Sequence, residues 1–474
     1  MADILLGGGT GAGMLGARVA PLSLPRAAAW IFACSAMVLL LLAPAIWNGF
    51  PLIFPDTGGY LDRPVLGTLG MGRSAFYGAF LYLGLPSSFW LNIVAQAALI
   101  TWLIVLALRT HGLGGRPWLA LGIVALLTAT TSMPWFTAQL MPDILFPAAA
   151  LALHMLTFRN AALHRWERWA LAAVIVAAIP SHMAAAGMCL AVLLALALLT
   201  RVPKLALPRA RFGFAAAAVA AGIALCPVSN YAITGNFALT PGGSSFLFGR
   251  LVEDGIVIRY LNDKCPDESL QLCAFTDDFP TDADGWLWDG DSPFRKLKSF
   301  EGGLEEKRIT RETLALYPLM HLNAAFSAAL QQLFKFATEV SSADNTPTIA
   351  MFKDHTPALY PQFMQARQQA GPFDVSGLNA VHVPVAALAM AGLVAALLFR
   401  RRIGLADELA ALAATVMLAL VANAAICGVF SHAVDRYQSR LVWLTVLVAA
   451  MIAARLILQR RHGDLEASPP PATN

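Results

Sequence analysis

The stretch Ala28–Phe50, AAWIFACSAMVLLLLAPAIWNGF, contains no charged residue. It is long enough to cross a bilayer, because a helix needs roughly 20 apolar residues to span the hydrocarbon. Leu91–Leu108 and Leu441–Leu458 have the same character, with at most one charge each. Only helices and closed barrels satisfy their backbone polar groups in lipid, and uninterrupted apolar runs favour helices over alternating barrel strands. The predicted fold is therefore an all-α polytopic membrane protein.

The composition of the whole chain agrees with this prediction. Of its 474 residues, 58% are hydrophobic and only 13% are charged, whereas soluble domains carry about 25% charged residues. A tight turn at Pro180–His182 is expected to separate the fifth and sixth segments. Hydropathy predicts about ten transmembrane helices, near residues 28–50, 90–108, 118–133, 141–157, 167–180, 183–200, 212–231, 381–399, 409–429 and 441–458.

Lysine and arginine are distributed unequally between the two sides of this pattern. With the N-terminus inside, the inner connections and helix ends hold 17 of these residues. The short outer connections hold only Arg63, Arg73, Arg436 and Arg440. Positive residues are enriched on the cytoplasmic side of membrane proteins, so both termini are predicted to be cytoplasmic in the inner (plasma) membrane. The predicted divisions are a cytoplasmic tail 1–27, a transmembrane core 28–231 with a first outer loop 51–89, an extracytoplasmic loop domain 232–380, transmembrane helices 381–458 and a cytoplasmic tail 459–474.

The large outer loop is polar and acidic, with 12 Lys/Arg, 19 Asp/Glu and a net charge of −7. Cys265 and Cys273 are its only cysteines, and a pair in an oxidising compartment predicts a disulfide. Asp277–Asp291 is acidic, but it lacks the EF-hand spacing that calcium binding requires, and we interpret it as a solvated loop. Leu314–Thr338 mixes apolar and polar residues, which predicts an amphipathic helix on the membrane surface.

Polar residues at the predicted outer helix ends are the candidates for a functional site. Charged side chains at a membrane boundary have a high free-energy cost, so those that are present are usually paired or functional. The topology gathers these residues on one face, where carboxylates, arginines and aromatic rings suit an anionic, lipid-linked substrate. The candidates are Asp56, Tyr60, Arg73, Asp143, His182, Arg436, Tyr437 and Arg440.

Most of these candidates also have a structural interpretation. Asp56 precedes Thr-Gly-Gly and could cap a turn. Asp143 could stabilise the positive start of the next helix, and a lone His182 is typical of a satisfied interfacial residue. Arg436 and Arg440, four residues apart on one helical face, could be snorkelling anchors. The residue types alone leave both interpretations open.

Four short motifs in the membrane core resemble a known family. Pro55–Tyr60 (PDTGGY) and Gly72–Tyr77 (GRSAFY) resemble the opening of GT-C-type membrane glycosyltransferases. These include the polyprenyl-phosphate-sugar-dependent enzymes related to protein mannosyltransferases and the lipid A aminoarabinose transferase. Met141–Phe146 (MPDILF) looks like the family's second acidic position, and Asp435–Tyr437 (DRY) is similar to its late Arg-Tyr motif. The resemblance does not extend to the large outer loop.

The resemblance implies a GT-C-like fold and a transferase reaction. A sugar would move from a polyprenyl-phosphate donor to a glycan, lipid or protein acceptor of the cell envelope, with no nucleic-acid partner. Asp56 and Asp143 would be catalytic, and Asp56 would act as general base toward the acceptor hydroxyl. The other six candidates would bind substrate, the arginines holding its phosphate. Some members use a divalent metal with two adjacent acids; Asp56 has no adjacent acid, so metal use stays open.

Two other function classes compete with this one. A transporter or flippase of lipid-linked saccharide needs polar groups near the bilayer midplane and often discontinuous helices. Here nearly every ionisable residue lies at a predicted helix end, which disfavours transport. A non-catalytic subunit of an envelope-polymer assembly would not need its acidic residues to converge.

A catalytic site, in contrast, requires that its carboxylates and arginines converge on the substrate. We therefore expect Asp56 to line an outward-facing pocket with at least one candidate arginine, beneath residues of the large loop. We also expect this pocket to open sideways to lipid, because a polyprenyl chain is too apolar to arrive through water.

Overall fold

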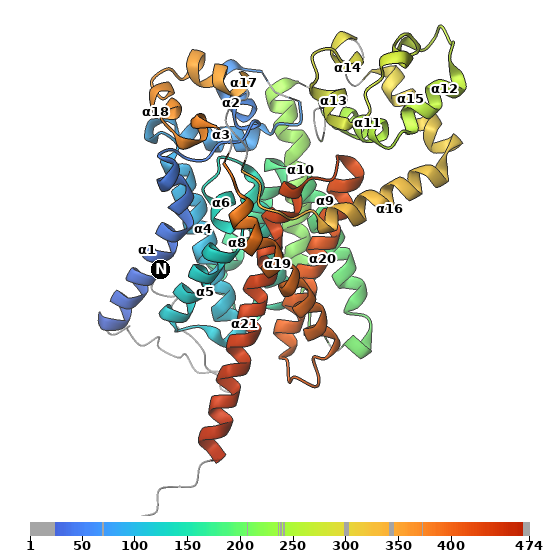
Figure 1. Cartoon of the computed structure of the whole chain (residues 1–474). Coiled ribbons are helices and arrows are strands. Elements are labelled where there is room, and N and C mark those ends of the chain that lie inside the picture. The colour runs from blue at the N-terminus through green and yellow to red at the C-terminus, as the bar shows by residue number, and fades with distance from the viewer. Residues whose placement is uncertain are drawn as a thin grey trace, which may run out of the picture.

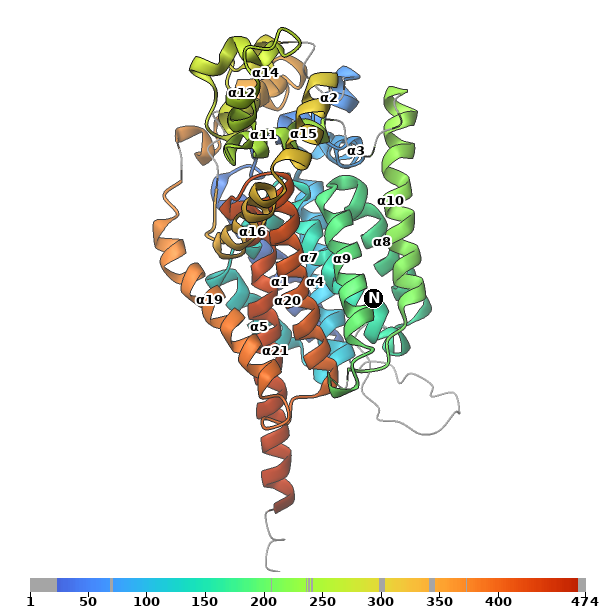
Figure 2. The same cartoon turned by 90° about the vertical axis from the view of Figure 1, so that its right-hand side faces the viewer.

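The computed structural model is a bundle of roughly parallel helices with shorter helices gathered at one end (Figure 1, Figure 2). We call this the loop end of the bundle, and the end with the α19–α20 turn the tail end. Residues 1–23 and 468–474, which make up most of the two predicted tails, lie outside the described residues. The structure describes residues 24–68, 71–205, 207–235, 237, 239, 242–297, 303–340, 346–371 and 373–467.

Each of the ten predicted apolar segments forms a helix of the bundle. The fifth and sixth segments are two separate helices, as the Pro180–His182 turn predicted. The last helix runs beyond its predicted end at residue 458, and the residues that follow directly, Gln459, Arg460 and Arg461, are good helix formers. The bundle helices are α1 Leu24–Asn48, α4 Trp90–Leu108, α5 Pro117–Thr130, α7 Leu145–Phe158, α8 Arg165–Ser181, α9 Ala184–Leu199, α10 Phe212–Thr234, α19 Ser376–Leu398, α20 Asp407–Phe430 and α21 Asp435–Ala467.

Six of the described helices are long and apolar enough to cross a membrane, namely α1, α4 with its continuation to Leu113, α10, α19, α20 and α21. Helices α5, α7 and α9 are apolar but shorter. Helix α7 is buried on every side from Phe146 to Phe158, as expected of a helix that is hydrophobic all round. The chain therefore has the architecture of a multi-pass helical membrane protein.

The loop end is built from two groups of short helices. Residues 242–297 and 303–316, here called the loop module, have a hydrophobic core of their own around Phe248, Tyr260 and Trp286. The first loop and residues 346–370 form a second group beside it (Figure 1). The remaining helices are α2 Thr57–Leu66, α3 Ala75–Leu83, α6 Met133–Thr137, α11 Gly243–Glu253, α12 Ile256–Lys264, α13 Ala283–Trp288, α14 Pro293–Lys296, α15 Leu304–Leu316, α16 Pro318–Phe334, α17 Thr346–Ala350 and α18 Tyr360–Met364.

Helix α16 is the amphipathic helix that the sequence predicted. It bends by 101° from α15 and crosses the bundle axis obliquely at the level where the loop module meets the bundle (Figure 1). One face packs on α20 so closely that a side chain at Gly428 would meet the carbonyl oxygen of Ala328 at 2.6 Å. The opposite face exposes an apolar stripe, which suits a helix lying at a lipid surface. The stripe is Leu319, Leu322, Phe326, Leu330 and Phe334.

Cys265 and Cys273 form the predicted disulfide in the loop module. Because disulfides persist in oxidising compartments, we expect both cysteines to resist maleimide labelling in native membranes until a reductant is added. Their replacement by serine is expected to destabilise the loop module by about 2 kcal/mol, since the bridge closes only a short loop. The control is a chain in which serine replaces the four free cysteines. Labelling of Cys265 and Cys273 before reduction would place the loop end in a reducing compartment.

Candidate functional site

Two connections at the loop end are fastened to each other by backbone hydrogen bonds. The Leu52 amide donates to the Ala138 carbonyl (3.0 Å), and the Leu140 amide donates to the Leu52 carbonyl (2.8 Å). The hydroxyl of Thr57 also donates to the Leu140 carbonyl. The first outer loop therefore lies against the turn that leads into α7, which brings the two candidate aspartates close together.

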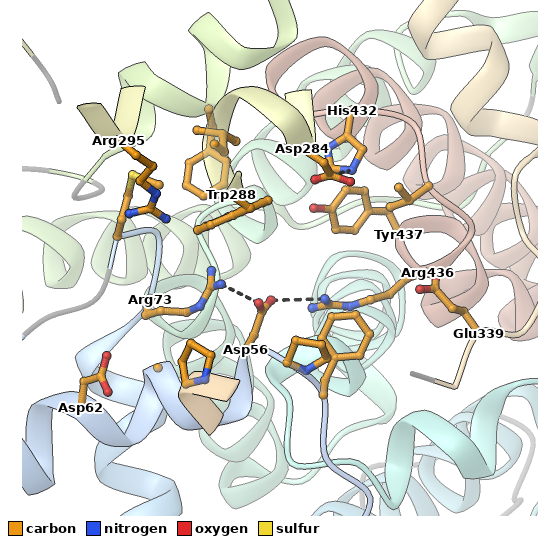
Figure 3. Close-up of a pocket in the computed structure, with 18 residues that line it drawn as sticks. Asp56, Asp62, Arg73, Asp284, Trp288, Arg295, Glu339, His432, Arg436 and Tyr437 are labelled. Carbon is orange, nitrogen blue, oxygen red and sulfur yellow. Dashed lines mark hydrogen bonds and ion pairs between the residues drawn. The ribbon is translucent and has the colours of Figure 1, made fainter. Parts of the chain in front are cut away.

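Asp56 stands immediately before α2, but its side chain does not cap that helix. Its carboxylate instead accepts from Arg73 (2.5 Å) and from Arg436 (3.3 Å), as Figure 3 shows. The carboxylate is 23% exposed, so it is held between two guanidinium groups and still reaches the surface. The interpretation of Asp56 as a turn cap is wrong.

Asp143 lies deeper, in a short 3-10 turn before α7, and is completely buried. Arg436 donates to both of its carboxylate oxygens (3.2 and 3.0 Å), and Arg440 donates to one of them (3.0 Å). The guanidinium of Arg436 stacks over Phe54, and that of Arg440 over Phe146. Both arginines point into the protein, so they are not snorkelling anchors. A buried charge needs such partners.

These residues form one alternating chain of charges, Arg73–Asp56–Arg436–Asp143–Arg440. The three arginines and two aspartates leave a net charge of +1. The chain runs from the surface into the bundle and joins the first loop, the turn before α7 and the start of α21. Sequence positions as distant as 56 and 436 are thus fixed relative to each other by ion pairs.

A cavity of about 760 Å³ opens above Asp56. Its floor comes from the first loop and the start of α21, and its upper wall comes from the loop module (Figure 3). The described residues that line it are Phe54, Pro55, Asp56, Gly59, Asp62, Met71, Arg73, Phe246, Asp284, Leu287, Trp288, Arg295, Glu339, Pro347, His432, Val434, Arg436 and Tyr437.

Four of the eight sequence candidates do not line this cavity. Asp143 and Arg440 lie beneath it, completely buried. Tyr60 is buried against Tyr77, with ring centroids 5.2 Å apart. His182 packs edge-on against Phe146 and accepts a hydrogen bond from the amide of Ala184, so it has the structural role that its isolation suggested. The other four candidates, Asp56, Arg73, Arg436 and Tyr437, line the cavity.

The turn before Arg436 is held in place by α16. The side-chain amide of Gln332, which is completely buried, donates to the Val434 carbonyl (2.8 Å) and accepts from the Val434 amide (3.0 Å). The Asp435 carboxylate accepts from the Ala337 amide (2.7 Å). Asp435 therefore ties the turn before Arg436 to the backbone that follows α16. The helix that carries the exposed apolar stripe thus also positions a wall of the cavity.

Two further carboxylates on the cavity wall are partly withdrawn from water. Burial raises the pKa of Glu339, against the opposing effect of Arg436. Burial also raises the pKa of Asp62, against the opposing effect of Arg73. Both shifts favour the neutral form of a carboxyl group beside the charged chain.

Several lining residues were not predicted from the sequence. Asp284 and Trp288 belong to α13, inside the acidic segment Asp277–Asp291 that we had interpreted as a solvated loop. Asp282 caps this helix by accepting from the Gly285 amide. The available signal was the pair of tryptophans in an otherwise acidic, turn-rich segment, because exposed aromatic rings in polar loops often serve binding.

Among the described residues, no group of three or more His, Cys, Asp or Glu side chains is arranged to hold a metal ion. No protein-family model, curated protein or solved structure matches this chain. The function is therefore inferred from the geometry of the site.

Proposed function

We propose that this protein is a GT-C-like membrane glycosyltransferase. It transfers a sugar from a polyprenyl-phosphate donor to a glycan, lipid or protein acceptor at the outer face of the membrane. The observation that carries the proposal is the position of Asp56, a partly exposed carboxylate held between Arg73 and Arg436 on the floor of a 760 Å³ cavity. A carboxylate and arginines that converge from distant parts of the chain have the chemistry that this reaction needs.

In the proposed reaction the acceptor hydroxyl attacks the anomeric carbon of the donor sugar. A new C–O glycosidic bond forms as the bond between the anomeric carbon and the phosphate oxygen breaks. The bonding electron pair leaves with that oxygen, so the product is polyprenyl phosphate. The hydroxyl proton passes to the carboxylate of Asp56, which acts as general base.

The arginines of the charge chain that line the cavity hold the donor's phosphate in this proposal. Phosphate is a good leaving group once its charge is held, and guanidinium groups hold phosphate well. Arg73 and Arg436 line the cavity and can reach a ligand, whereas Arg440 is completely buried. Asp143 lies between Arg436 and Arg440 and fixes the direction of Arg436. Its role is to position Arg436, and it does not touch the substrate.

The arrangement in the membrane belongs to the same proposal. All ten bundle helices span, both termini are cytoplasmic, and the loop end faces the outside. The exposed stripe of α16 then lies in the outer leaflet. A lipid-linked donor would reach the site sideways from this leaflet, with its isoprenoid chain still in lipid.

A transfer assay with the purified full chain tests the proposal. The detergent-solubilised protein is incubated with a panel of polyprenyl-phosphate-linked hexoses and an extract of cell-envelope glycans and lipids. Mass spectrometry should detect free polyprenyl phosphate and a glycosylated acceptor only when the protein is present. Comparison of cell-envelope glycans with and without the protein then identifies the acceptor. A chain that consumes no donor of the panel, and whose loss changes no envelope glycan, is not a glycosyltransferase.

A further inference from the structure

Trp288 is placed differently from the neighbouring tryptophan of its helix. Trp286 is completely buried in the core of the loop module, whereas Trp288 is 43% exposed and lines the cavity. Figure 3 shows its ring nearly edge-on above Asp56 and Arg73, with Arg295 toward one end and Asp284 toward the other. Exposing the apolar surface of a large ring to water is unfavourable, and a ligand that covers the ring would recover that free energy.

The faces of the Trp288 ring are not closely covered in the structure. The guanidinium carbons of Arg73 and Arg295 lie 5.8 and 5.6 Å from its centroid. These distances are near the outer limit of about 6 Å for a cation–π contact. By comparison, the guanidinium of Arg440 stacks directly on the ring of Phe146 at 3.4 Å. The ring of Phe246 also lies beside it, at 61° to its plane and with the centroids 6.1 Å apart. Because Trp288 is still 43% exposed, part of its ring surface is available to a ligand that stacks on it.

Arg295 provides the second observation. Three arginines line the cavity, and two of them, Arg73 and Arg436, are already paired with carboxylates. Within the part of the chain that the structure describes, Arg295 has no carboxylate partner. Its guanidinium lies only against the rings of Trp288 and Phe294. An exposed guanidinium of this kind is available to an anion.

We propose that Trp288 and Arg295 form a sugar-phosphate subsite, supplied by the loop module, on the upper wall of the cavity. The apolar C–H face of a pyranose stacks on Trp288, and the phosphate attached to that sugar lies between Arg295 and Arg73. This inference rests on the proposed function and deepens it. It assigns recognition of the donor's sugar to the loop module, whereas Asp56 lies on the opposite wall, which comes from the first loop.

The arrangement fits the proposed transfer reaction. A sugar held against Trp288 faces the floor of the cavity, where Asp56 accepts the acceptor's proton (Figure 3). Among the described residues, no carboxylate pairs with Arg295, so this arginine can bind the phosphate without giving up an ion pair to that part of the chain. Asp284, beside Trp288, supplies a carboxylate that can accept hydrogen bonds from sugar hydroxyls.

The test measures binding separately from transfer. Binding is followed by native mass spectrometry of the full chain carrying Asp56→Asn, so that no donor is consumed. The probes are a polyprenyl-phosphate-linked hexose and the same polyprenyl phosphate without a sugar. Trp288→Leu is expected to weaken binding of the sugar-bearing probe by about threefold to tenfold and to leave the bare phosphate unaffected. Arg295→Gln is expected to weaken both by at least about tenfold.

Two variants serve as controls. Trp288→Phe keeps an aromatic face and should retain most of the sugar-dependent binding. Lys296→Gln removes a positive charge from α14, the helix that carries Arg295. Lys296 pairs with the exposed Asp291 and does not line the cavity, so this variant should change neither affinity. All variants are compared with the parent protein by thermal unfolding, and Trp288→Phe replaces Trp288→Leu as the test if the latter is unstable, with a smaller loss expected.

The possible outcomes separate this inference from the proposed function. The subsite is overturned if Trp288→Leu weakens the binding of both probes equally. It is likewise overturned if Lys296→Gln weakens binding as much as Arg295→Gln does. It is also overturned if phosphatidylglycerol competes with both probes equally, because Arg295 would then bind any lipid phosphate. If binding depends on Trp288 as expected but no sugar is transferred by the wild-type chain, the subsite stands and the glycosyltransferase function fails.

Discussion

Replacement of Asp143 by alanine is expected to lower the free energy of unfolding by about 3–5 kcal/mol, because it leaves two buried arginines without their shared carboxylate. Asp143 is completely buried and accepts three hydrogen bonds from Arg436 and Arg440. Transfer should also fall, because Arg436 would lose the partner that directs it toward Asp56. Asp143→Asn keeps the size of the side chain but not its charge, and an intermediate loss of stability is expected.

The measurement is unfolding of the solubilised protein with a denaturing detergent, followed by near-ultraviolet circular dichroism. The matched control is Asp263→Ala, which removes an exposed carboxylate that pairs with Arg259 and accepts a hydrogen bond from the Tyr317 hydroxyl. Exposed pairs contribute at most about 1 kcal/mol. An Asp143→Ala protein as stable as the Asp263→Ala protein would show that the charge chain does not hold the loop end together.

Replacement of Asp56 by asparagine is expected to reduce the rate of transfer by about 10²–10⁴-fold, the usual contribution of a general base. Asparagine has the same shape and still accepts a hydrogen bond from Arg73 or Arg436, but it cannot take the acceptor's proton. The unfolding transition should therefore change much less than the rate. The loss should fall mainly on kcat, measured as polyprenyl phosphate released per enzyme at saturating donor.

The matched control is Asp289→Asn, which makes the same substitution one residue after Trp288, at an exposed position outside the cavity lining. Its rate should equal that of the wild type. A non-catalytic assembly subunit would tolerate Asp56→Asn, so an unchanged envelope-glycan profile with this variant would favour the scaffold interpretation over catalysis.

The helices could be predicted from the sequence because their cause is local. An apolar run in lipid must satisfy its backbone hydrogen bonds within itself, and a helix does so without reference to the rest of the chain. The same holds for the amphipathic helix α16, whose two faces follow from residue spacing. The Cys265–Cys273 bridge spans a separation of eight residues, and its partners were the only cysteines of their loop. These features were determined by the sequence alone.

The length of each helix in the structure was less predictable. Six helices are long and apolar enough to cross a membrane, whereas α5, α7 and α9 are apolar but shorter. Between α5 and α7 the chain forms two short separate helices, Met133–Thr137 and Pro142–Ile144, each with a proline in its first turn, and these divide the apolar stretch there. A window of hydropathy averages over such interruptions, because it measures composition and not backbone geometry.

The tertiary structure decided which candidate residues meet. The predicted topology placed Asp56, Asp143 and the outer arginines on one side of the membrane. How deeply each side chain lies within the bundle could not be predicted from local sequence. Asp143 is completely buried and Asp56 reaches the cavity because the bridge between Leu52 and Gln139 stacks one loop above the other. Trp288 and Arg295 enter the site only because the loop module folds back over the first loop. Contacts between residues so distant in sequence depend on packing of the whole chain, which no local pattern specifies.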